Sequence, residues 1–390
     1  MIMDDWETVT LADISIGGKG SYGIPAPAIP YSEGRYTYLR ITDINDDGTL
    51  NLSDRKSLDD PAAQEYLLQP NDIVFARTGN STGRNYFYNP EDGDLVYAGF
   101  LIKFSIDPEK VNPKYIKYYM LSPKYRAWIT AFNTGSTRGN INAQTYANMR
   151  IDIPPRKQQD LLVDVLSSLD AKIRINNQIN RNLEEQAKAI FKSWFVDFEP
   201  FGGEPPEDWK TICFSSFLKP RREKSSDSTI PLFAVTNNGI IPRDAKFKKQ
   251  LSHTGAQNKV AYRTDLVFGM SREILNWGIM QTEIGCISSA YHVFSVSKDI
   301  DSRYLEFYIK ANIGYFKDLI RPASREGQGL DQQALMSKEI LLPPEDIISA
   351  YHNIADPIFA RIQQINAENQ TLSTLRDNLL PKLMSCDNIS

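Results

Sequence analysis

The side chains best suited to chemistry gather in the segment 77–86, which reads Arg-Thr-Gly-Asn-Ser-Thr-Gly-Arg-Asn-Tyr. It directly follows the strand-like run 72–76 and mixes guanidinium groups, short hydroxyl and amide side chains, and glycines that permit close backbone approach. Arginine offers paired donors to guanine or phosphate, asparagine or glutamine pairs with adenine, and serine or threonine contacts either. The pattern suits hydrogen bonding to DNA, and an ordinary solvated surface turn stays open as the alternative.

Other polar loops have the same character. The segment 270–278 follows a second strand-like run at 265–269, and the loops 134–140 and 323–329 form another pair. Basic residues between 219 and 249 add groups that could contact phosphates. The candidate DNA-contacting residues are Lys19, Tyr22, Arg77, Thr78, Asn80, Ser81, Thr82, Arg84, Tyr86, Thr137, Arg138, Asn140, Arg221, Arg222, Ser271, Arg272, Asn276, Trp277, Ser324, Arg325 and Gln328.

Sequence patterns for catalysis or metal binding are missing. The glycine-rich segment 17–21 lacks the spacing of a phosphate-cradling loop, and no strand leads into a dinucleotide or methyl-donor loop. The segment 152–155, Asp-Ile-Pro-Pro, is interpreted as a strand end and helix start, with proline preset for the first turn. The three histidines and three cysteines have no metal-ligand spacing. We therefore expect no catalytic residue, no metal site and no cofactor in this chain.

Length and composition predict a soluble, multidomain protein. A chain of 390 residues with 41% hydrophobic and 24% charged residues suits two to four domains. No apolar run reaches the roughly 18 residues of a membrane span, and segment 1–6 has no signal-like core, so we expect a cytoplasmic protein without membrane contact. The net charge of −4 argues against general polyanion binding, so DNA contacts must come from local clusters.

One unit occurs twice in the chain. From Tyr115 to Trp194 and from Tyr304 to Leu383, equivalent positions lie 189 residues apart without a gap. Two copies are too few for a solenoid, so we expect pseudo-two-fold symmetry and a partner that also has two halves. Each copy begins with a turn-rich mixed α/β region that ends in an amphipathic helix, predicted at 113–132 and at 303–320.

A heptad seam follows each proline pair. Apolar positions alternate spacings of four and three over 162–194 and 351–383, and each seam carries one aligned asparagine. Such a buried polar residue fixes register at some expense of stability, which favours antiparallel helix pairing over two ordinary amphipathic helices. The residues expected in helix packing or partner contact are Leu169, Ile173, Asn180, Leu183, Phe191, Trp194, Phe195, Ile358, Ile362, Asn369, Leu372, Leu379 and Leu383.

Several segments together carry a family resemblance over the whole chain. They are Ile-Pro-Pro at 153–155 with its long helix, Ala-Ile-Phe-Lys-Ser-Trp-Phe-Val-Asp-Phe-Glu-Pro at 189–200, the second variable region with its 231–239 and 268–272 segments, and Leu-Pro-Pro at 342–344 with a second helix. In this order they resemble the specificity subunit of type I restriction-modification systems. The stretch Phe-Lys-Ser-Trp-Phe is the most specific of these signals.

The resemblance implies an α+β fold with two pseudosymmetric mixed α/β target recognition domains, separated by two long antiparallel coiled-coil helices. Each domain would read one half of a split DNA target, and the helices would set the unread spacer. The expected divisions are target recognition domain 1 at 1–153, a central conserved helical region at 154–203, target recognition domain 2 at 204–342, and a C-terminal conserved helical region at 343–390.

The resemblance also implies a noncatalytic subunit that acts through partners. Two modification subunits would bring S-adenosylmethionine and methylate adenine, and restriction subunits would add translocation and cleavage that use ATP and Mg²⁺. Two alternatives stay open at this point. One is a coiled-coil scaffold that binds proteins; the other is the recognition module of an enzyme that acts as one polypeptide, although the sequence offers no methyl-donor site.

Overall fold

The computed structural model describes residues 6–133, 140–236, 239–243, 257–269, 275–321 and 329–384. The chain divides into two compact units. Unit 1 comprises Met1–Asn177 and Asn366–Ser390, and unit 2 comprises Gln178–Ile365. The C-terminal segment therefore folds with the N-terminal part of the chain, although nearly 200 residues separate them in sequence.

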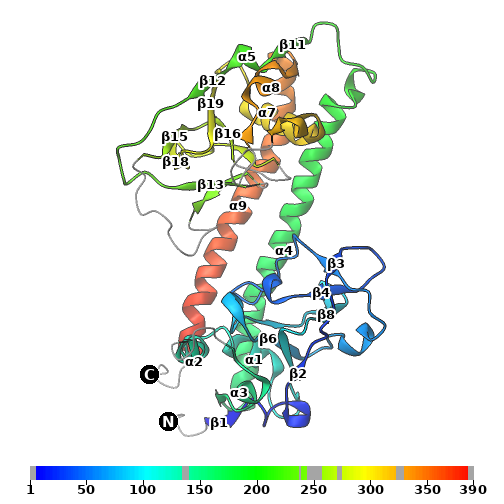
Figure 1. The fold of residues 1–390 in the computed structure, drawn as a ribbon, viewed down its shortest axis with the longest axis vertical. Helices are drawn as coiled ribbons and strands as arrows, with labels where there is room; N and C mark the ends of the chain where they lie inside the picture. Colours follow the sequence, from blue (N-terminus) through cyan, green and yellow to red (C-terminus); the bar gives the residue numbers. More distant parts are fainter. Residues whose placement is uncertain are drawn as a thin grey trace. The chain divides into compact units, whose positions relative to one another are not determined.

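Two four-stranded sheets form the centre of unit 1 (Figure 1). The first is antiparallel in the order β2-β9-β6-β7, with bounds Ser21–Tyr22, Leu101–Ser105, Asp72–Ala76 and Asn85–Phe87. The second has the order β3-β5-β4-β8 with a parallel β4–β8 pair, and its bounds are Ile29–Pro30, Lys56–Ser57, Thr37–Leu39 and Leu95–Tyr97. A further antiparallel pair joins β1 (Glu7–Thr10) to β10 (Arg150–Ile153).

Helices α1 (Pro113–Tyr119), α2 (Pro123–Asn133) and α3 (Ala143–Ala147) complete unit 1. The single helix predicted at 113–132 is therefore wrong: it is two helices, because Pro123 has no N–H to continue the first one and disfavours helical backbone in the residue before it. Strand β6 is buried along its whole length, as its β-branched and aromatic composition predicts.

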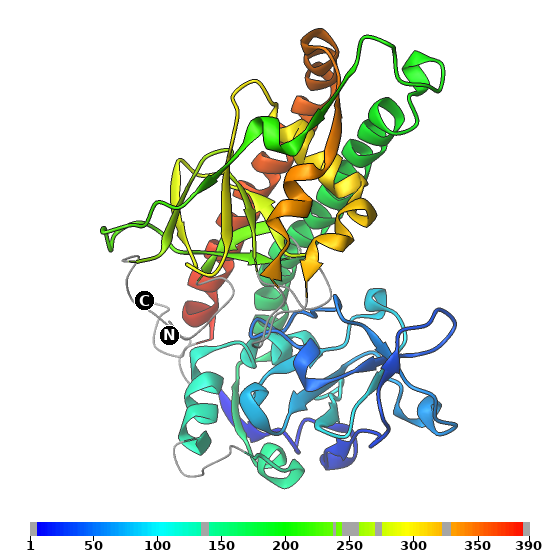
Figure 2. The same cartoon turned by 45° about the horizontal axis from the view of Figure 1, so that its top comes forward.

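Unit 2 shares one part of this plan, an antiparallel four-stranded sheet of corresponding strand order, while its other described strands form two-stranded pairs (Figure 2). Its four-stranded antiparallel sheet has the order β12-β19-β16-β17, with bounds Leu218–Arg221, His292–Val296, Leu266–Phe268 and Trp277–Ile279. Four two-stranded antiparallel pairs are also described. They join β11 (Lys210–Cys213) to β22 (Glu339–Leu342) and β13 (Phe233–Thr236) to β14 (Gly239–Pro242). They also join β15 (Lys259–Tyr262) to β18 (Ile284–Ile287) and β20 (Ile320–Arg321) to β21 (Gly329–Leu330).

Helices α5 (Phe214–Phe217), α7 (Ser302–Ala311) and α8 (Gln332–Ser337) and the 3₁₀ segment η7 (Ile313–Leu319) belong to unit 2. The helix predicted at 303–320 is thus α7 followed by η7. The backbone leaves the α conformation at Asn312, and a glycine follows two residues later, which weakens the helix further.

The helix caps of the two units stand at the same 189-residue offset as the sequences. Asn112 and Asp301 cap α1 and α7, while Asn142 and Asp331 cap α3 and α8, each through a side-chain oxygen that accepts from a backbone N–H in the first turn. The residue type differs in both pairs, but the capping function is retained. The duplication therefore extends from the sequence to the local structure.

A buried tyrosine also recurs at the 189-residue offset. Tyr115 donates to the backbone oxygen of Asp152 at 2.7 Å, and Tyr304 donates to the backbone oxygen of Leu341. Both tyrosines are fully buried and tie a helix to the last strand before the proline pair. Each unit thus uses one tyrosine to fix the start of its long helix.

A buried aspartate also begins the central strand in each unit. Asp72 accepts from the backbone N–H of Gln69 at 2.8 Å, and Asp265 accepts from that of Tyr262 at 2.9 Å. The residue before each aspartate, Asn71 or Thr264, has a φ of 73°. This left-handed backbone is unusual for a β-branched threonine, so the turn must be strongly determined by its surroundings.

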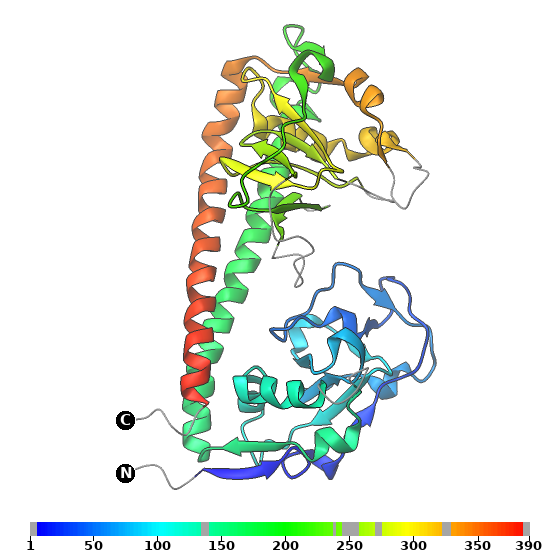
Figure 3. The same ribbon diagram turned by 60° about the vertical axis from the view of Figure 1, so that its left-hand side comes forward.

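Two long helices contribute to both units: α4 (Arg156–Phe195) and α9 (Glu345–Leu383). In unit 1 the two helices are neighbours (Figure 3). There Asp170 meets Arg376 and Asn176 meets Asn369, so residue numbers rise along α4 as they fall along α9. The helix segments within this unit are therefore antiparallel.

The predicted seam faces inward along both helices. Its positions all lie within the described residues, and every one of them is buried or half-buried. The aligned asparagine of α9, Asn369, accepts from Asn176 and donates to Asn177, each at 2.9 Å. In unit 2 the rings of Phe191 and Phe195 pack against Tyr351 of α9. None of the helices described here is both long and apolar enough to pass through a lipid bilayer.

Candidate nucleic-acid interface

The predicted loop 77–84 is the connection between β6 and β7 in unit 1. The backbone N–H of Ala76 donates to Arg84 and that of Gly83 donates back to Ala76, which closes the turn. Gly83 has a φ of +87°, and a Cβ there would lie 2.7 Å from the Ile129 side chain. This turn therefore requires glycine for both conformation and space.

Three of the predicted residues come together beside this turn. The Arg77 guanidinium lies over the ring of Tyr22, with 5.0 Å from Cζ to the ring centroid, and its Nε donates a long 3.4 Å hydrogen bond to Oδ1 of Asn140. The Tyr22 hydroxyl accepts from the backbone N–H of Ala143 at 3.1 Å, which ties the ring to the start of α3. These residues come from β2, from the end of β6 and from the segment before α3.

The other residues predicted near this turn differ in exposure. Lys19 and Asn80 are exposed, and Thr78 and Thr82 are half-buried. The Thr82 hydroxyl donates to a backbone oxygen within the turn at 2.8 Å, and Ser81 is buried. Lys19 and Asn80 therefore stay accessible to a ligand, while the Thr82 hydroxyl helps to stabilise the turn.

Two predicted contacts are core residues. Tyr86 is only 3% exposed and donates to Asp92 at 2.6 Å, and Trp277 is 6% exposed within the hydrophobic core of unit 2. A ring buried in this way cannot contact DNA while its domain stays folded. The interpretation of these two aromatic residues as surface contacts is therefore corrected.

Arg84 serves the fold of unit 1. Its Nε donates to Asp46 at 2.7 Å and its Nη1 donates to the backbone oxygen of Ile44 at 3.0 Å. These bonds join the β6–β7 turn to the loop that follows β4. Two of its donor positions are engaged within the domain, so Arg84 has a structural role, and its predicted DNA contact stays a prediction.

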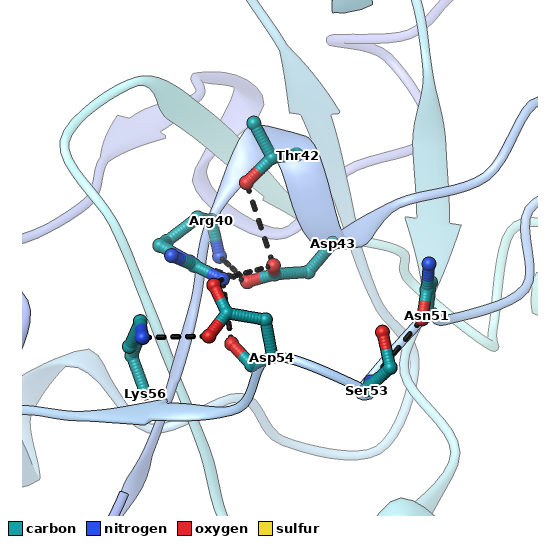
Figure 4. A network of polar contacts seen from close by, with 7 residues as sticks. All are labelled: Arg40, Thr42, Asp43, Asn51, Ser53, Asp54 and Lys56. Carbon is teal, nitrogen blue, oxygen red and sulfur yellow. Dashed lines mark hydrogen bonds and ion pairs between the residues drawn. The ribbon is translucent and has the colours of Figure 1, made fainter. Parts of the chain in front are cut away.

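That same loop is held by a second arginine. Arg40 donates to both carboxylate oxygens of Asp43, at 2.7 and 3.0 Å, and to the backbone oxygen of Asp54 at 2.8 Å. Figure 4 shows the guanidinium between the two aspartates, with Lys56 bound to Asp54 from the other side. The hydrogen bonds to Asp43 are the main reason that the pKa of Arg40 is raised.

Arg221 has a structural role in unit 2. Its guanidinium binds the buried carboxylate of Asp265 with two hydrogen bonds, at 2.7 and 3.1 Å, and lies over the Tyr262 ring. Lys103 lies 3.0 Å from the equivalent Asp72 in unit 1. Each domain thus neutralises its buried aspartate with a cation, and Arg221 is corrected from a DNA contact to that role.

A cluster of positive charge lies nearby in unit 2. Burial lowers the pKa of Lys259, and the charges of Lys224 and Arg222 lower it further. Mutual repulsion of this kind favours the arrival of an anion such as phosphate. Arg222 is exposed, and its DNA contact stays a prediction. Lys259 was not among the predicted contacts, because it lies in a strand rather than in a polar loop.

Another accessible residue was also missed. Phe100 is 59% exposed, and its backbone oxygen accepts from the N–H of Arg77 at 3.1 Å. An exposed phenylalanine beside an arginine offers an apolar contact, for example to a thymine methyl group. A single phenylalanine in a run of apolar residues carries no sequence signal for exposure.

Of the remaining predicted contacts, one lies within the described residues and the others lie outside them. Asn276 is half-buried at the start of β17, where its backbone oxygen accepts from Gly269. The predicted contacts that fall outside the described residues are Thr137, Arg138, Ser271, Arg272, Ser324, Arg325 and Gln328.

The residues predicted for helix packing or partner contact face inward. Phe191 and Phe195 are buried in the core of unit 2, Asn180 is also buried, and the remainder of this set is half-buried. Exposed apolar side chains occur instead at other positions of the two helices, and these are Leu161, Val165, Ile175, Ile354 and Leu375.

Known proteins place these features in a family. Residues 3–185 match the family described as the type I restriction modification DNA specificity domain. These residues belong to that specificity-domain family. The resemblance to specificity subunits predicted from the sequence is therefore confirmed.

Relatives extend the specificity-domain match along the chain. The type I restriction enzyme HindI specificity subunit of Haemophilus influenzae is 23% identical, over 98% of this chain and 99% of that protein. The type I restriction enzyme MjaIX specificity subunit of Methanocaldococcus jannaschii is 24% identical, over 72% of this chain and 70% of that protein. A solved type I restriction-modification S subunit from M. genitalium has a similar fold, with a TM-score of 0.52, 15% identity, and coverage of 98% and 96% of the two chains.

The groups on the candidate interface can be compared with the chemistry that each type of ligand needs. Among the described residues, no three or more histidine, cysteine or carboxylate side chains are grouped so that they could hold a metal ion. The accessible groups that the structure brings together are guanidinium, ammonium, amide and aromatic side chains. These groups suit phosphate and base-edge contacts.

Proposed function

We propose that this specificity subunit reads a bipartite DNA target, one half with each variable domain, across a fixed unread spacer. The two readers are the target recognition domains at 1–153 and 204–342, and the conserved helical regions at 154–203 and 343–390 connect them. The two long antiparallel helices would act as the spacer that separates the half-sites.

The observation that carries this proposal is one scaffold with two sets of surface residues. The helix caps, the hydrogen bonds of the buried Tyr115 and Tyr304, and the strand order of one four-stranded sheet recur in both units, so the local frameworks correspond. The residues on that framework differ: at the 189-residue offset Asn140 corresponds to Gly329, and at the 193-residue offset of the central strands Arg77 corresponds to Met270. Two domains with corresponding frameworks but different residues at corresponding positions would suit two different half-sites.

Partners would supply the chemistry. We propose that two modification subunits dock on the helical regions, where the exposed apolar side chains of α4 and α9 lie, and that they bring S-adenosylmethionine to methylate adenine. Restriction subunits would add translocation and cleavage with ATP and Mg²⁺. The subunit itself would be noncatalytic, hold none of these cofactors and work in the cytoplasm on double-stranded DNA.

Methylation mapping tests this proposal. The chain is expressed with and without the modification subunit of the same system, and methylated adenines are mapped across the host DNA. The proposal expects a split motif with a fixed gap that appears only when both proteins are present. A continuous motif, or methylation by the modification subunit alone, would contradict it. A soluble complex that methylates nothing would favour the scaffold alternative.

A further inference from the structure

Arg77 differs from Arg84 and Arg221, two other arginines predicted to contact DNA. The guanidinium groups of Arg84 and Arg221 are both bound to carboxylates of their own domains, at 2.7 Å in each case. Within the described part of the chain, Arg77 makes no ion pair, and only its Nε donates, to the neutral Asn140. Its two terminal nitrogens therefore keep their donors for a ligand.

The surroundings of Arg77 fix the plane of its guanidinium. The Tyr22 ring supports one face, and the Asn140 oxygen holds the inner edge. Tyr22 is itself anchored by the backbone of Ala143, although its ring is 42% exposed. A guanidinium held between a ring and an amide loses little rotamer entropy when it binds, because its orientation is already set.

The two terminal nitrogens of the Arg77 guanidinium can pair with the acceptors of a guanine. Two parallel N–H donors fit the O6 and N7 acceptors that guanine presents in the major groove, and this is the commonest specific contact between proteins and DNA. A phosphate needs only a mobile cation, such as the exposed Lys19, and gains less from a fixed plane. The ring and amide around Arg77 therefore favour base reading over phosphate contact.

We propose that Arg77 reads a guanine in the half-site recognised by unit 1, with Tyr22 and Asn140 as the residues that position it. This inference rests on the proposed function, because it assigns one base of the bipartite target to one side chain. It further predicts that the half-site read by unit 2 does not depend on Arg77.

The test is motif mapping with variants of the full chain in complex with the modification subunit. In Arg77→Ala and Arg77→Lys, the half-site read by unit 1 should lose its requirement for guanine at one position, with preference for that base falling about ten- to a hundredfold. The lysine variant keeps the charge but loses the planar fork, so its affinity for DNA without the target should stay near wild type while its affinity for the guanine-containing half-site falls. The half-site read by unit 2 should not change.

Positioning is tested through the ring and the amide. Tyr22→Phe retains the ring and should keep most of the preference, whereas Tyr22→Ala and Asn140→Ala should weaken it. Arg55 is a matched control in the same unit, because it is exposed and lies over the Tyr31 ring at 5.7 Å without an amide at its inner edge. Arg55→Ala should leave the motif unchanged.

The outcomes distinguish failure of the proposed function from failure of the assignment of Arg77. If wild-type protein yields no split motif, the proposed function fails. If wild type yields one and Arg77→Lys retains the full guanine preference, or if the half-site contains no guanine, the assignment of Arg77 is wrong while the proposed function stands. Equal relaxation of both half-sites would also overturn the assignment.

Discussion

The arginines in the polar segments of this chain fall into two groups according to their partners. Arg84 and Arg221 are bound within their domains, while Arg77 is oriented by a ring and an amide and keeps its terminal donors. The sequence identified all three as candidates, Arg77 and Arg84 from a polar segment after a strand and Arg221 from a cluster of basic residues. Their carboxylate partners, Asp46 and Asp265, lie 38 and 44 residues away in the chain, so local sequence could not separate the groups.

The turn that carries Arg77 allows a prediction from its two glycines. Gly79 and Gly83 both have positive φ, but a Cβ on Gly79 would meet nothing within 4 Å, whereas one on Gly83 would lie 2.7 Å from Ile129. Gly79→Ala should lower the free energy of unfolding by about 1 kcal/mol through backbone strain alone. Gly83→Ala should lower it by about 2 to 4 kcal/mol, since overpacking adds to the same strain. Urea unfolding of the two variants gives the difference, and equal losses would show that Ile129 moves aside freely.

At the scale of elements, one aspartate joins three helices of unit 1. Asp170 on α4 accepts from Lys117 at 2.6 Å and Tyr118 at 2.9 Å on α1, and from Arg376 on α9 at 3.2 Å. Burial by itself raises the pKa of Asp170, but the Lys117 ammonium and the other donors outweigh it, so the pKa lies below its usual range. The ionised form is therefore tied to the folded state.

This arrangement predicts a pH-dependent stability difference. Asp170→Asn should lower the free energy of unfolding by about 2 kcal/mol at neutral pH, the usual contribution of a hydrogen-bonded charge. Because the folded pKa is depressed, the stabilisation is complete above about pH 4 and is lost as pH falls through the lowered pKa. Urea unfolding should give a constant gap from pH 8 to 5 that narrows only below this. The control is Asp164→Asn, since Asp164 is exposed on the same helix and should show no gap.

The end of α9 gives a second prediction at this scale. Leu380 and Met384 are buried in the core of unit 1 with Leu162 and Leu166 of α4. Deletion of residues 379–390 should therefore expose this core and lower the thermal stability of unit 1. Limited proteolysis, with cleavage sites mapped by mass spectrometry, measures which unit opens first. First cleavage in unit 2 would contradict this packing.

The elements themselves were predictable to different degrees. The seam of α4 and α9 followed from periodicity, because one face of a long helix must be buried and its spacing is visible in the sequence. The breaks at Pro123 and Asn312 interrupt apolar patterns that continue across them, so periodicity alone merged two elements into one. The packing of residues 379–384 against the N-terminal domain depends on tertiary contacts that no local pattern records.

At the scale of the whole molecule, duplication was the strongest information in the sequence. Retained caps at Asn112 and Asp301 show that selection for the local fold tolerates a change of residue when the capping oxygen is kept. The residues proposed to read DNA have no such constraint from the fold, which would explain why they differ between copies. Under the proposed function, substitutions in one domain alone would change the specificity for one half-site.

The proposed spacer function makes the last prediction. One heptad inserted between residues 177 and 178, together with one between 365 and 366, adds seven residues to both helices at the boundary between the units and keeps the seam of each unit in register. Seven helical residues add about 10 Å, which corresponds to about three base pairs of DNA. The double insertion should therefore lengthen the unread spacer by about three base pairs without altering either half-site, while either insertion alone should mismatch the seam and reduce methylation. Motif mapping reads the spacer directly. A spacer that stays at its wild-type length in an active double-insertion variant would show that the helices do not set it.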